Sequence, residues 1–337
     1  MKAFIKAVSY YLPEEILDNS SLGQIFPEWG VDKISAKTGI YQRHIAAKNE
    51  FASDMAVMAA KNLFKEHSVE PSSIDFVLLC TQSPDYFLPT TACLVQNILG
   101  IPTSAGALDF NLGCSGYIYG LTLAKGLVFA GVASNILLLT AETYTKFIHQ
   151  KDKSNRTIFG DGASATLITA TEGIASIEAF ELGTDGKGAK NLIVKNGGLR
   201  FPSEVGSDTQ DQFGNVHNDN NLYMNGPEIF NFTSEFVPAL VKKTIEKNGM
   251  KEEDVNLFIL HQANKYMLNH LRKKMNIAEE RFYYFLENCG NTVSATIPIA
   301  LHHAIKEDKM NGNVLLAGFG VGYSWGACVI KKIERGI

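Results

Sequence analysis

The chain carries the same pattern of strand, loop and helix twice, at an offset of about 180 residues. Three segments of the first half have counterparts in the second half, in the same order. The matched pairs are Phe76-Val-Leu-Leu-Cys-Thr-Gln-Ser with Leu257-Phe-Ile-Leu-His-Gln-Ala-Asn, Gly113-Cys114 with Gly290-Asn291, and Asn135-Ile-Leu-Leu-Leu-Thr-Ala with Asn313-Val-Leu-Leu-Ala-Gly-Phe. Single apolar strands resemble one another by chance, but three ordered matches at one spacing indicate an internal repeat. We therefore predict two duplicated α/β halves, residues 1–172 and residues 173–337.

Short apolar strands alternate with helical segments along both halves. Phe76–Cys80 and Ala107–Asn111 have the composition of buried strands, whereas Asn19–Lys37 and Glu228–Lys247 have that of helices. This alternation favours helices layered on parallel sheets. Between Gly183 and Asn221 the composition shifts toward Gly, Asn, Asp and Lys, which predicts loops and a hairpin lying over one face.

The composition narrows the class of protein. The 337 residues are 45% hydrophobic, enough for a sizeable core, and the net charge of −4 gives no attraction to nucleic acid or to an anionic membrane. Five cysteines form neither a CxxC pair nor a Cys/His ligand spacing, which predicts free thiols and no metal site. No apolar run reaches the length of a membrane span, and the N-terminal stretch is too short for a signal peptide. We therefore expect a soluble, cytoplasmic protein.

Cys114 stands at the point where a strand leads into a helix. The stretch Ala107–Leu121 is apolar, turns at Gly113 and continues with helical spacing from Ser115. The N-terminus of a helix carries unpaired N–H groups and a partial positive charge, both of which favour a thiolate. We therefore expect a pKa below the usual value of about 8.5 and a nucleophilic role for this cysteine. The alternative is a buried cysteine that fills a small gap.

Two further polar residues follow strands of the second half. His261 comes directly after the apolar run Leu257–Leu260, and Asn291 lies in the turn at Gly290 before the next helix. Because functional residues gather where the strands of α/β layers end, both are predicted to face one cleft with Cys114. An imidazole beside an amide offers two neutral donors to a developing enolate oxygen. Taken singly, each could equally be a structural histidine or a turn asparagine.

These motifs in this order resemble β-ketoacyl-acyl-carrier-protein synthase III, of the thiolase-like condensing enzymes. The resemblance covers residues from about 4 to 330. It rests on Thr38-Gly-Ile with Arg43-His-Ile, Gly113-Cys-Ser-Gly, Phe159-Gly-Asp-Gly-Ala, His261-Gln-Ala-Asn, Gly290-Asn-Thr and Gly318-Phe-Gly-Val-Gly-Tyr-Ser-Trp-Gly. The family implies a thiolase-like five-layer αβαβα fold, a homodimer and an acyltransferase of fatty acid biosynthesis. Its members take an acyl group from a thioester onto the cysteine and condense it with malonyl-acyl-carrier protein, releasing CO2, with no cofactor beyond the thioester substrates.

The resemblance also implies a role for each site residue. Cys114 corresponds to the nucleophile, and His261 and Asn291 correspond to the donors that stabilise the enolate. The oxyanion hole for the acyl thioester would consist of the backbone N–H groups of Cys114 and Val321. The family usually has glycine at Val321, so its side chain is expected to narrow the cavity. Phe319 corresponds to an aromatic residue beside the histidine and the asparagine.

The entrance departs most from the family pattern. Lys37 and Lys153 stand where the family has arginines that contact coenzyme A (CoA), and lysine lacks the planar fork that suits phosphate. Asn264 is retained, and Trp29 is a candidate replacement for a tryptophan that stacks on the adenine. The primer is therefore expected on CoA with altered contacts or on a carrier protein. Two further residues, Leu88 and Gly226, are assigned to the pocket and its entrance. Leu88 would reach the partner subunit's site, where a leucine suggests a primer longer than acetyl.

A basic triplet follows His261 on the next helix. Arg272, Lys273 and Lys274 match residues that dock the acidic carrier protein in the family. Most such triplets are solvated helix faces, which is the alternative interpretation. Carrier-protein docking is nevertheless the interpretation that the resemblance favours.

Other functions remain compatible with parts of the pattern. A papain-like hydrolase shares the order Cys, His, Asn but has another cysteine context and no duplicated halves. A degradative thiolase would place a second cysteine in the glycine loop at 318–322, where this chain has none, and a non-catalytic subunit would have lost one of the three residues. A specialised relative, serving secondary metabolism or surface-glycan acyl supply, and a Cys-dependent acyltransferase that does not condense remain alternatives. Neither primer length nor pathway follows from the sequence.

Overall fold

A computed structural model describes residues 2–28, 30–202, 206–211 and 214–334. The strands are β1 Phe4–Tyr11, β2 Glu15–Asp18, β3 Gln42–Ile45, β4 Phe76–Cys80, β5 Gly106–Phe110, β6 Asn135–Glu142, β7 Gly162–Thr169, β8 Ala175–Thr184, β9 Leu192–Ile193, β10 Thr209–Gln210, β11 Val216–His217, β12 Tyr223–Met224, β13 Val255–Leu260, β14 Asn313–Gly320 and β15 Ser324–Lys332. The helices are α1 Asn19–Ile25, α2 Val31–Thr38, α3 Ala52–His67, α4 Thr91–Ile98, α5 Gly116–Phe129, α6 Lys153–Arg156, α7 Gly226–Lys247, α8 Lys265–Lys274 and α9 Thr296–Lys306.

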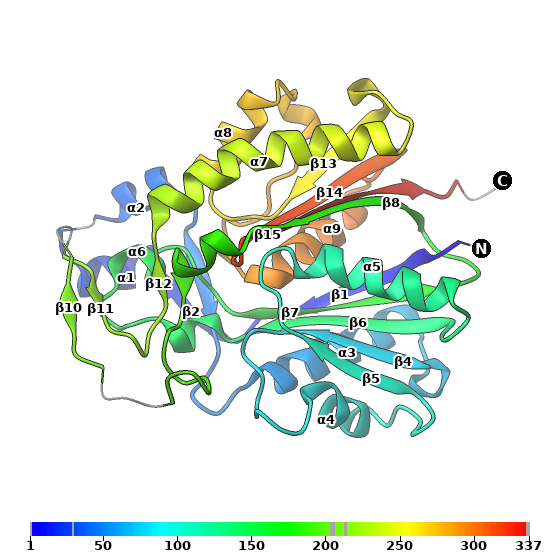
Figure 1. Ribbon diagram of the computed structural model, residues 1–337, viewed down its shortest axis with the longest axis horizontal. Coiled ribbons are helices and arrows are strands. Elements are labelled where there is room, and N and C mark those ends of the chain that lie inside the picture. The colour runs from blue at the N-terminus through cyan, green and yellow to red at the C-terminus, as the bar shows by residue number, and fades with distance from the viewer. Residues whose placement is uncertain (1, 29, 203–205, 212–213, 335–337) are drawn as a thin grey trace.

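Helices and sheets alternate in five layers (Figure 1). Helices α3 and α4 cover the outer face of the first sheet, α5 and α9 lie between the two sheets, and α7 and α8 cover the outer face of the second. Each of the three helical layers buries its own apolar cluster against a sheet face, and the largest cluster surrounds the two central helices. The five-layer αβαβα arrangement confirms the fold class predicted from the sequence.

The two halves have the same strand order. The first half runs β4–β6–β7–β1 and the second β13–β14–β15–β8; in both, the first pair is parallel and the next two pairs are antiparallel. Strand β5 extends the first half, and a parallel bridge between Phe258 and Phe282 takes the corresponding place in the second. The register agrees as well, because Phe76 pairs with Ile136 just as Leu257 pairs with Val314. These matches reproduce the repeat detected in the sequence.

The sheets of the two halves are joined at one edge, so hydrogen bonds link all nine strands into one continuous sheet. Strand β1 pairs with β8 through Phe4 and Ser176 and through Ile5 and Ala175. The predicted division between residues 172 and 173 falls in the turn that connects β7 to β8. The exact boundary of the two halves stays a prediction.

One predicted element is wrong. The segment Asn19–Lys37 was expected to be a single helix, but it forms α1 and α2, with Pro27 between them. The residue before a proline is sterically driven out of the helical region, and Phe26 has φ −124° and ψ 78°. The hairpin expected between Gly183 and Asn221 is the pair β10–β11, and β9 of the same region pairs with β12 just beyond it.

Strand β14 touches the turn that carries Cys114. A Cβ atom at Gly318 would lie 2.5 Å from the carbonyl oxygen of Cys114 and 2.9 Å from the Cα of Ser115. Both are backbone atoms, so no side-chain movement could relieve the clash. The close approach of the two halves therefore requires glycine here.

We expect Gly318→Ala to lower the free energy of unfolding by about 1–3 kcal/mol, because the added methyl group overpacks the contact between the halves. Gly126→Ala is the matched control, since Gly126 lies inside α5 and a Cβ atom there would have no neighbour within 4 Å. That control should be neutral or stabilise by up to about 1 kcal/mol. Urea denaturation measures both, and equal stability of the two variants would contradict the proposed contact.

Candidate active site

Cys114 lies in the turn between β5 and α5 and is 7% exposed. Its side chain belongs to a buried apolar cluster, here called the thiol cluster, whose members come from both halves: Cys114, Tyr144, Ile148, Phe159, Leu192, Leu222 and Val293. A Cβ atom at Gly320 would lie 3.1 Å from the Cys114 sulfur. The end of β14 therefore forms a wall directly beside the thiol.

The environment of the thiol differs from the expectation. Burial, followed by the neighbouring Glu142 carboxyl, raises the pKa of Cys114 well above its usual range, and the Cys114 N–H opposes this shift. The prediction that the helix N-terminus lowers this pKa is therefore wrong for the free protein. The physical reason is that desolvation in an apolar pocket outweighs the partial charge of α5, whose first residue is Gly116.

Glu142 is a buried acid at the end of β6 that sequence reasoning missed. Its carboxyl accepts hydrogen bonds from the Gln82 N–H at 3.0 Å, the Ser294 hydroxyl at 2.8 Å and the Ser83 hydroxyl at 3.4 Å. Burial raises the pKa of Glu142 to about 8. Because Ser294 belongs to the second half, this carboxyl ties the two halves together beside the thiol. In the sequence, this acid could have been noticed as the single charged residue of the apolar strand Asn135–Glu142.

His261 and Asn291 are side by side. The Nδ2 atom of Asn291 lies 3.5 Å from Nε2 of His261, and both residues are buried. The Val293 N–H donates to Oδ1 of Asn291 at 2.9 Å, which turns the amide NH2 toward the histidine. Burial lowers the pKa of His261 to about 3, so the imidazole is neutral at physiological pH. The pair therefore consists of two neutral groups held in a fixed orientation.

Strand β14 brings this pair to the thiol. The backbone N–H of His261 donates to the Ala317 carbonyl, and the ring of Phe319 packs edge-on against the imidazole with centroids 5.7 Å apart. The neighbouring Gly318 and Gly320 meet Cys114. Phe159 of the thiol cluster forms an isolated parallel β-bridge with Asn291. The structure therefore gathers the three predicted residues around one strand end.

The residues assigned to the oxyanion hole and to the pocket differ in how close they lie to Cys114. Val321 lies beside the Cys114 turn, since its Cγ1 would be 2.8 Å from a Cβ atom at Gly113. Gly226 begins α7 and is exposed, with open space around it. Leu88 is 86% exposed on the loop after β4 and is not a member of the thiol cluster of its own chain. The roles of these residues stay predictions.

Two of the residues assigned to the CoA entrance, Lys37 and Asn264, line a cavity of about 210 Å³. Its lining residues are Lys37, Thr38, Ser154, Thr157, Ile158, Asn264 and Tyr266. Asn264 also caps α8, with its side chain accepting a hydrogen bond from the Met267 N–H at 2.8 Å. Lys153 does not line this cavity and forms an ion pair with Glu28. Trp29 lies outside the described residues.

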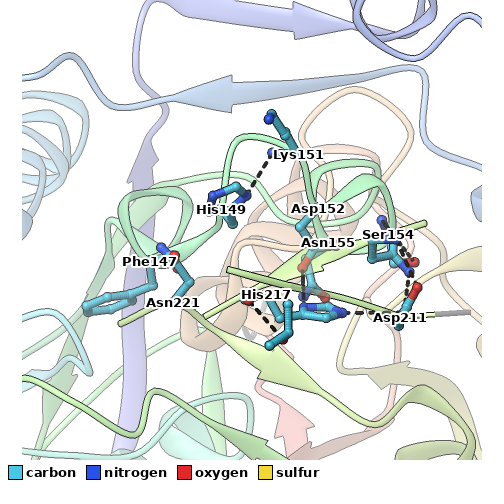
Figure 2. Close-up of polar contacts among 11 residues, drawn as sticks. Phe147, His149, Lys151, Asp152, Ser154, Asn155, Asp211, His217 and Asn221 are labelled. Carbon is cyan, nitrogen blue, oxygen red and sulfur yellow. Dashed lines mark hydrogen bonds and ion pairs between the residues drawn. The ribbon is translucent and has the colours of Figure 1, made fainter. Parts of the chain in front are cut away.

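A polar network holds the β10–β11 hairpin against α6, next to this entrance (Figure 2). The Asp152 carboxylate caps α6 through the Asn155 N–H at 2.9 Å. His217 lies between Asp152 and Asp211, with nitrogen–oxygen distances of 3.7 and 3.4 Å. Burial raises the pKa of Asp152, while Asn155 and His217 act in the opposite direction. The network fixes the backbone that carries Lys153.

The basic triplet divides into two kinds of residue. Arg272 is partly buried and occupied inside the protein, with its guanidinium donating to the Tyr284 hydroxyl and to Glu279, both at 3.1 Å. Lys273 and Lys274 are exposed. Arg272 therefore has a structural role, and the docking prediction narrows to the two lysines.

Within the described part of the chain, no group of three or more His, Cys, Asp or Glu residues could hold a metal ion. Over the same residues, no helix combines the length and apolar character that crossing a bilayer would need.

The fold and the site define a thiolase-like condensing enzyme. Family models described as 3-oxoacyl-acyl-carrier-protein (ACP) synthase III and its C-terminal part match residues 108–186 and 245–332. The chain is 36% identical over 323 residues to the β-ketoacyl-acyl-carrier-protein synthase III of Clostridium perfringens (strain ATCC 13124), covering 95% of this chain and 96% of that protein. It therefore belongs to the β-ketoacyl-acyl-carrier-protein synthase III family, whose members are acyltransferases.

Solved structures agree with this assignment. A 2.1 Å crystal structure of a 3-oxoacyl-(acyl-carrier-protein) synthase III is 50% identical, with a TM-score of 0.96 over 98% of this chain and 100% of that one. The Thermus thermophilus synthase III is 33% identical, with a TM-score of 0.86 over 98% and 100% of the two chains. The priming β-ketosynthase of the R1128 polyketide pathway is 25% identical, with a TM-score of 0.84 over 99% and 97%.

The raised pKa of Glu142 predicts a pH-dependent difference in stability. Between about pH 4.5 and pH 8 the carboxyl is protonated in the folded protein and ionised in the unfolded chain, so the unfolded state binds fewer protons. This group therefore lowers the free energy of unfolding as pH rises, by up to about 1.4 kcal/mol per pH unit. Glu142→Gln removes that contribution, and its stability relative to wild type should increase from about pH 5 to about pH 8.

Urea denaturation across this range provides the measurement. The exposed Glu253→Gln variant is the control, because its carboxylate is solvated in both states and the variant should follow the wild type at every pH. Parallel curves for Glu142→Gln and wild type would show that the buried carboxyl is ionised in the folded protein.

Proposed function

We propose that this protein is a β-ketoacyl-acyl-carrier-protein synthase that uses Cys114 as nucleophile. The single observation that carries the proposal is the convergence of Cys114, His261 and Asn291 on the end of β14. A thiol, a neutral imidazole and a carboxamide beside one apolar pocket are the groups that thioester condensation needs.

The first step transfers the primer. The Cys114 sulfur attacks the acyl carbonyl, the thioester bond to the carrier breaks, and the carrier thiol leaves with the proton that Cys114 gives up. The backbone N–H groups of Cys114 and Val321 would hold the oxyanion. Because burial keeps the free thiol protonated, proton loss is coupled to thioester binding rather than completed beforehand.

The second step condenses the primer with malonyl-acyl-carrier protein. The bond between the malonyl methylene and the carboxylate breaks, CO2 leaves, and the electron pair moves into an enolate whose oxygen accepts hydrogen bonds from His261 and Asn291. The enolate carbon then attacks the acyl group on Cys114 and releases the sulfur. Neutral donors suit this step, since a buried charged imidazole would hold the substrate carboxylate instead of releasing it as CO2.

The homodimer is part of the proposal. Tyr86, Phe87 and Leu88 are 60%, 79% and 86% exposed on one loop. A contiguous apolar loop tip of this kind favours contact with a second subunit. Leu88 would then reach the partner subunit's pocket, as the family resemblance implies.

The entrance supports a carrier protein as one source of the primer. Lys153 is paired with Glu28, so a nucleotide phosphate of CoA would compete with a carboxylate for this ammonium group. A phosphopantetheine arm on a carrier protein lacks that nucleotide and avoids the competition. This departure from the family pattern also supports a specialised pathway, such as the polyketide pathway of the R1128 relative, as the second candidate function.

Intact-protein mass spectrometry after incubation with an acyl thioester should show the acyl mass on Cys114, and Cys114→Ala should gain none.

His261→Ala should retain acylation, but its rate of malonyl decarboxylation should fall by about 10²–10³-fold, because one enolate donor is removed. Acyl mass on another residue would refute the nucleophile, and an unchanged decarboxylation rate in His261→Ala would refute the donor.

Reversing the charge of Lys273 and Lys274 to glutamate should lower kcat/KM for malonyl-acyl-carrier protein by about tenfold, because an acidic partner loses its steering contacts. Turnover of malonyl-CoA should change little. The control is Lys61→Glu with Lys65→Glu, two exposed lysines on α3 in the opposite outer layer. Equal losses with both malonyl donors would rule out docking at α8.

A further inference from the structure

We infer that Thr296 is a positioning residue whose hydroxyl donates a hydrogen bond to Nδ1 of His261 and so keeps the ring proton on Nε2, the nitrogen that faces Asn291. The inference rests on the proposed function, in which Nε2 must be a donor to the enolate oxygen. It assigns a task to a residue that neither the motifs nor the family pattern singled out.

The Thr296 hydroxyl has two possible acceptors. Its Oγ1 lies 2.7 Å from Nδ1 of His261 and 3.0 Å from the carbonyl oxygen of Val293. The hydroxyl carries one hydrogen and can satisfy only one of them fully. The Val293 carbonyl already accepts the backbone N–H of Thr296, at the turn where α9 begins. That carbonyl has a second lone pair and can accept the hydroxyl as well, but the contact to the imidazole is the shorter of the two, and the inference assigns the hydrogen to it.

The position of the ring proton follows from this contact. His261 is neutral, so its ring carries one hydrogen, and a nitrogen that accepts from Thr296 leaves that hydrogen on the other nitrogen. The Nε2 and Asn291 Nδ2 atoms are 3.5 Å apart, longer than an ordinary hydrogen bond. Two N–H groups at this separation do not satisfy each other, and both can donate to one oxygen placed between them.

The opposite arrangement would disable the site. If Nδ1 carried the hydrogen, it would donate to Thr296, whose hydroxyl would then donate to Val293. Nε2 would present a lone pair toward the enolate oxygen, which repels it. Asn291 cannot compensate, because the Val293 N–H bond fixes its amide in one orientation. The hydroxyl of Thr296 therefore decides whether the enolate meets two donors or one.

A pair of isosteric substitutions in the same turn tests this role. Thr296→Val removes the hydroxyl at constant shape, and Thr296→Ser restores it. Thr292→Val is the matched control, because Thr292 is also fully buried but its Oγ1 has no hydrogen-bond partner among the described residues. Malonyl decarboxylation by Thr296→Val should fall about 10- to 100-fold, with little change in Thr296→Ser and Thr292→Val. Acylation of Cys114, measured by mass spectrometry, should be unchanged in all three.

Histidine ¹⁵N NMR provides a readout that a merely structural role would not move. In the wild type, the His261 signals, assigned by their loss in His261→Ala, should have the pattern of an Nε2–H imidazole; Thr296→Val should shift them toward the other form. An Nδ1–H pattern in the wild type overturns the inference, even where Thr296→Val fails to fold. Decarboxylation at the wild-type rate in Thr296→Val, or parallel loss of acylation, overturns it too. Failure of the proposed function itself would appear separately, as a wild type that neither acylates Cys114 nor decarboxylates malonyl.

Discussion

Close packing of β14 against the Cys114 turn is the contact on which the active site depends. Gly318 and Gly320 bring this strand of the second half within van der Waals distance of the nucleophile's backbone and sulfur. The same strand holds His261 through the Ala317 carbonyl and the ring of Phe319. One strand therefore sets the position of His261 relative to the thiol. Because it belongs to the half that lacks the cysteine, the site exists only when the halves are packed.

Burial gives the site a uniform electrostatic character. It raises the pKa values of Cys114 and Glu142 and lowers that of His261, so all three groups are neutral in the free protein around pH 7. A neutral, largely apolar site costs little to desolvate and leaves charge to appear only during the reaction. In the proposed reaction, the enolate would then meet oriented N–H donors in a medium of low polarity, where they stabilise negative charge more than water-exposed donors would.

Much of this architecture was predictable from the sequence because it rests on patterns that repeat. The matched segments at Phe76 and Leu257 predicted two equivalent sheets, and the paired strands have the register that this match implies. Cys114 and His261 were recognisable because each follows a strand, and Asn291 because its turn matches the turn of Cys114 in the repeat. The roles of Glu142 and Thr296 were not, because their partners come from remote segments and no local pattern marks them.

Packing also accounts for the pKa of Cys114 and for the contacts of Arg272. The pKa of Cys114 depends on how deeply tertiary packing buries the sulfur, which the strand–turn–helix motif does not specify. The basic triplet on α8 has the composition of a docking surface, yet Arg272 turns inward because Tyr284 and Glu279 lie within its reach. In each case packing in the folded chain decides what the local sequence pattern leaves open.

The duplication itself explains how one scaffold yields an asymmetric site. Gly113-Cys114 and Gly290-Asn291 occupy equivalent turns before the central helices, so the scaffold directs both residues to one cleft. His261 is the counterpart of Cys80, which ends β4. The Cys80 thiol donates to the Leu112 carbonyl at 3.0 Å, and burial raises its pKa well above the usual range. The Cys80 thiol of the first half thus takes the place that the His261 imidazole has in the second half. The repeat thus places different side chains at equivalent positions, and in the proposed reaction Cys114 would come from one half and His261 and Asn291 from the other.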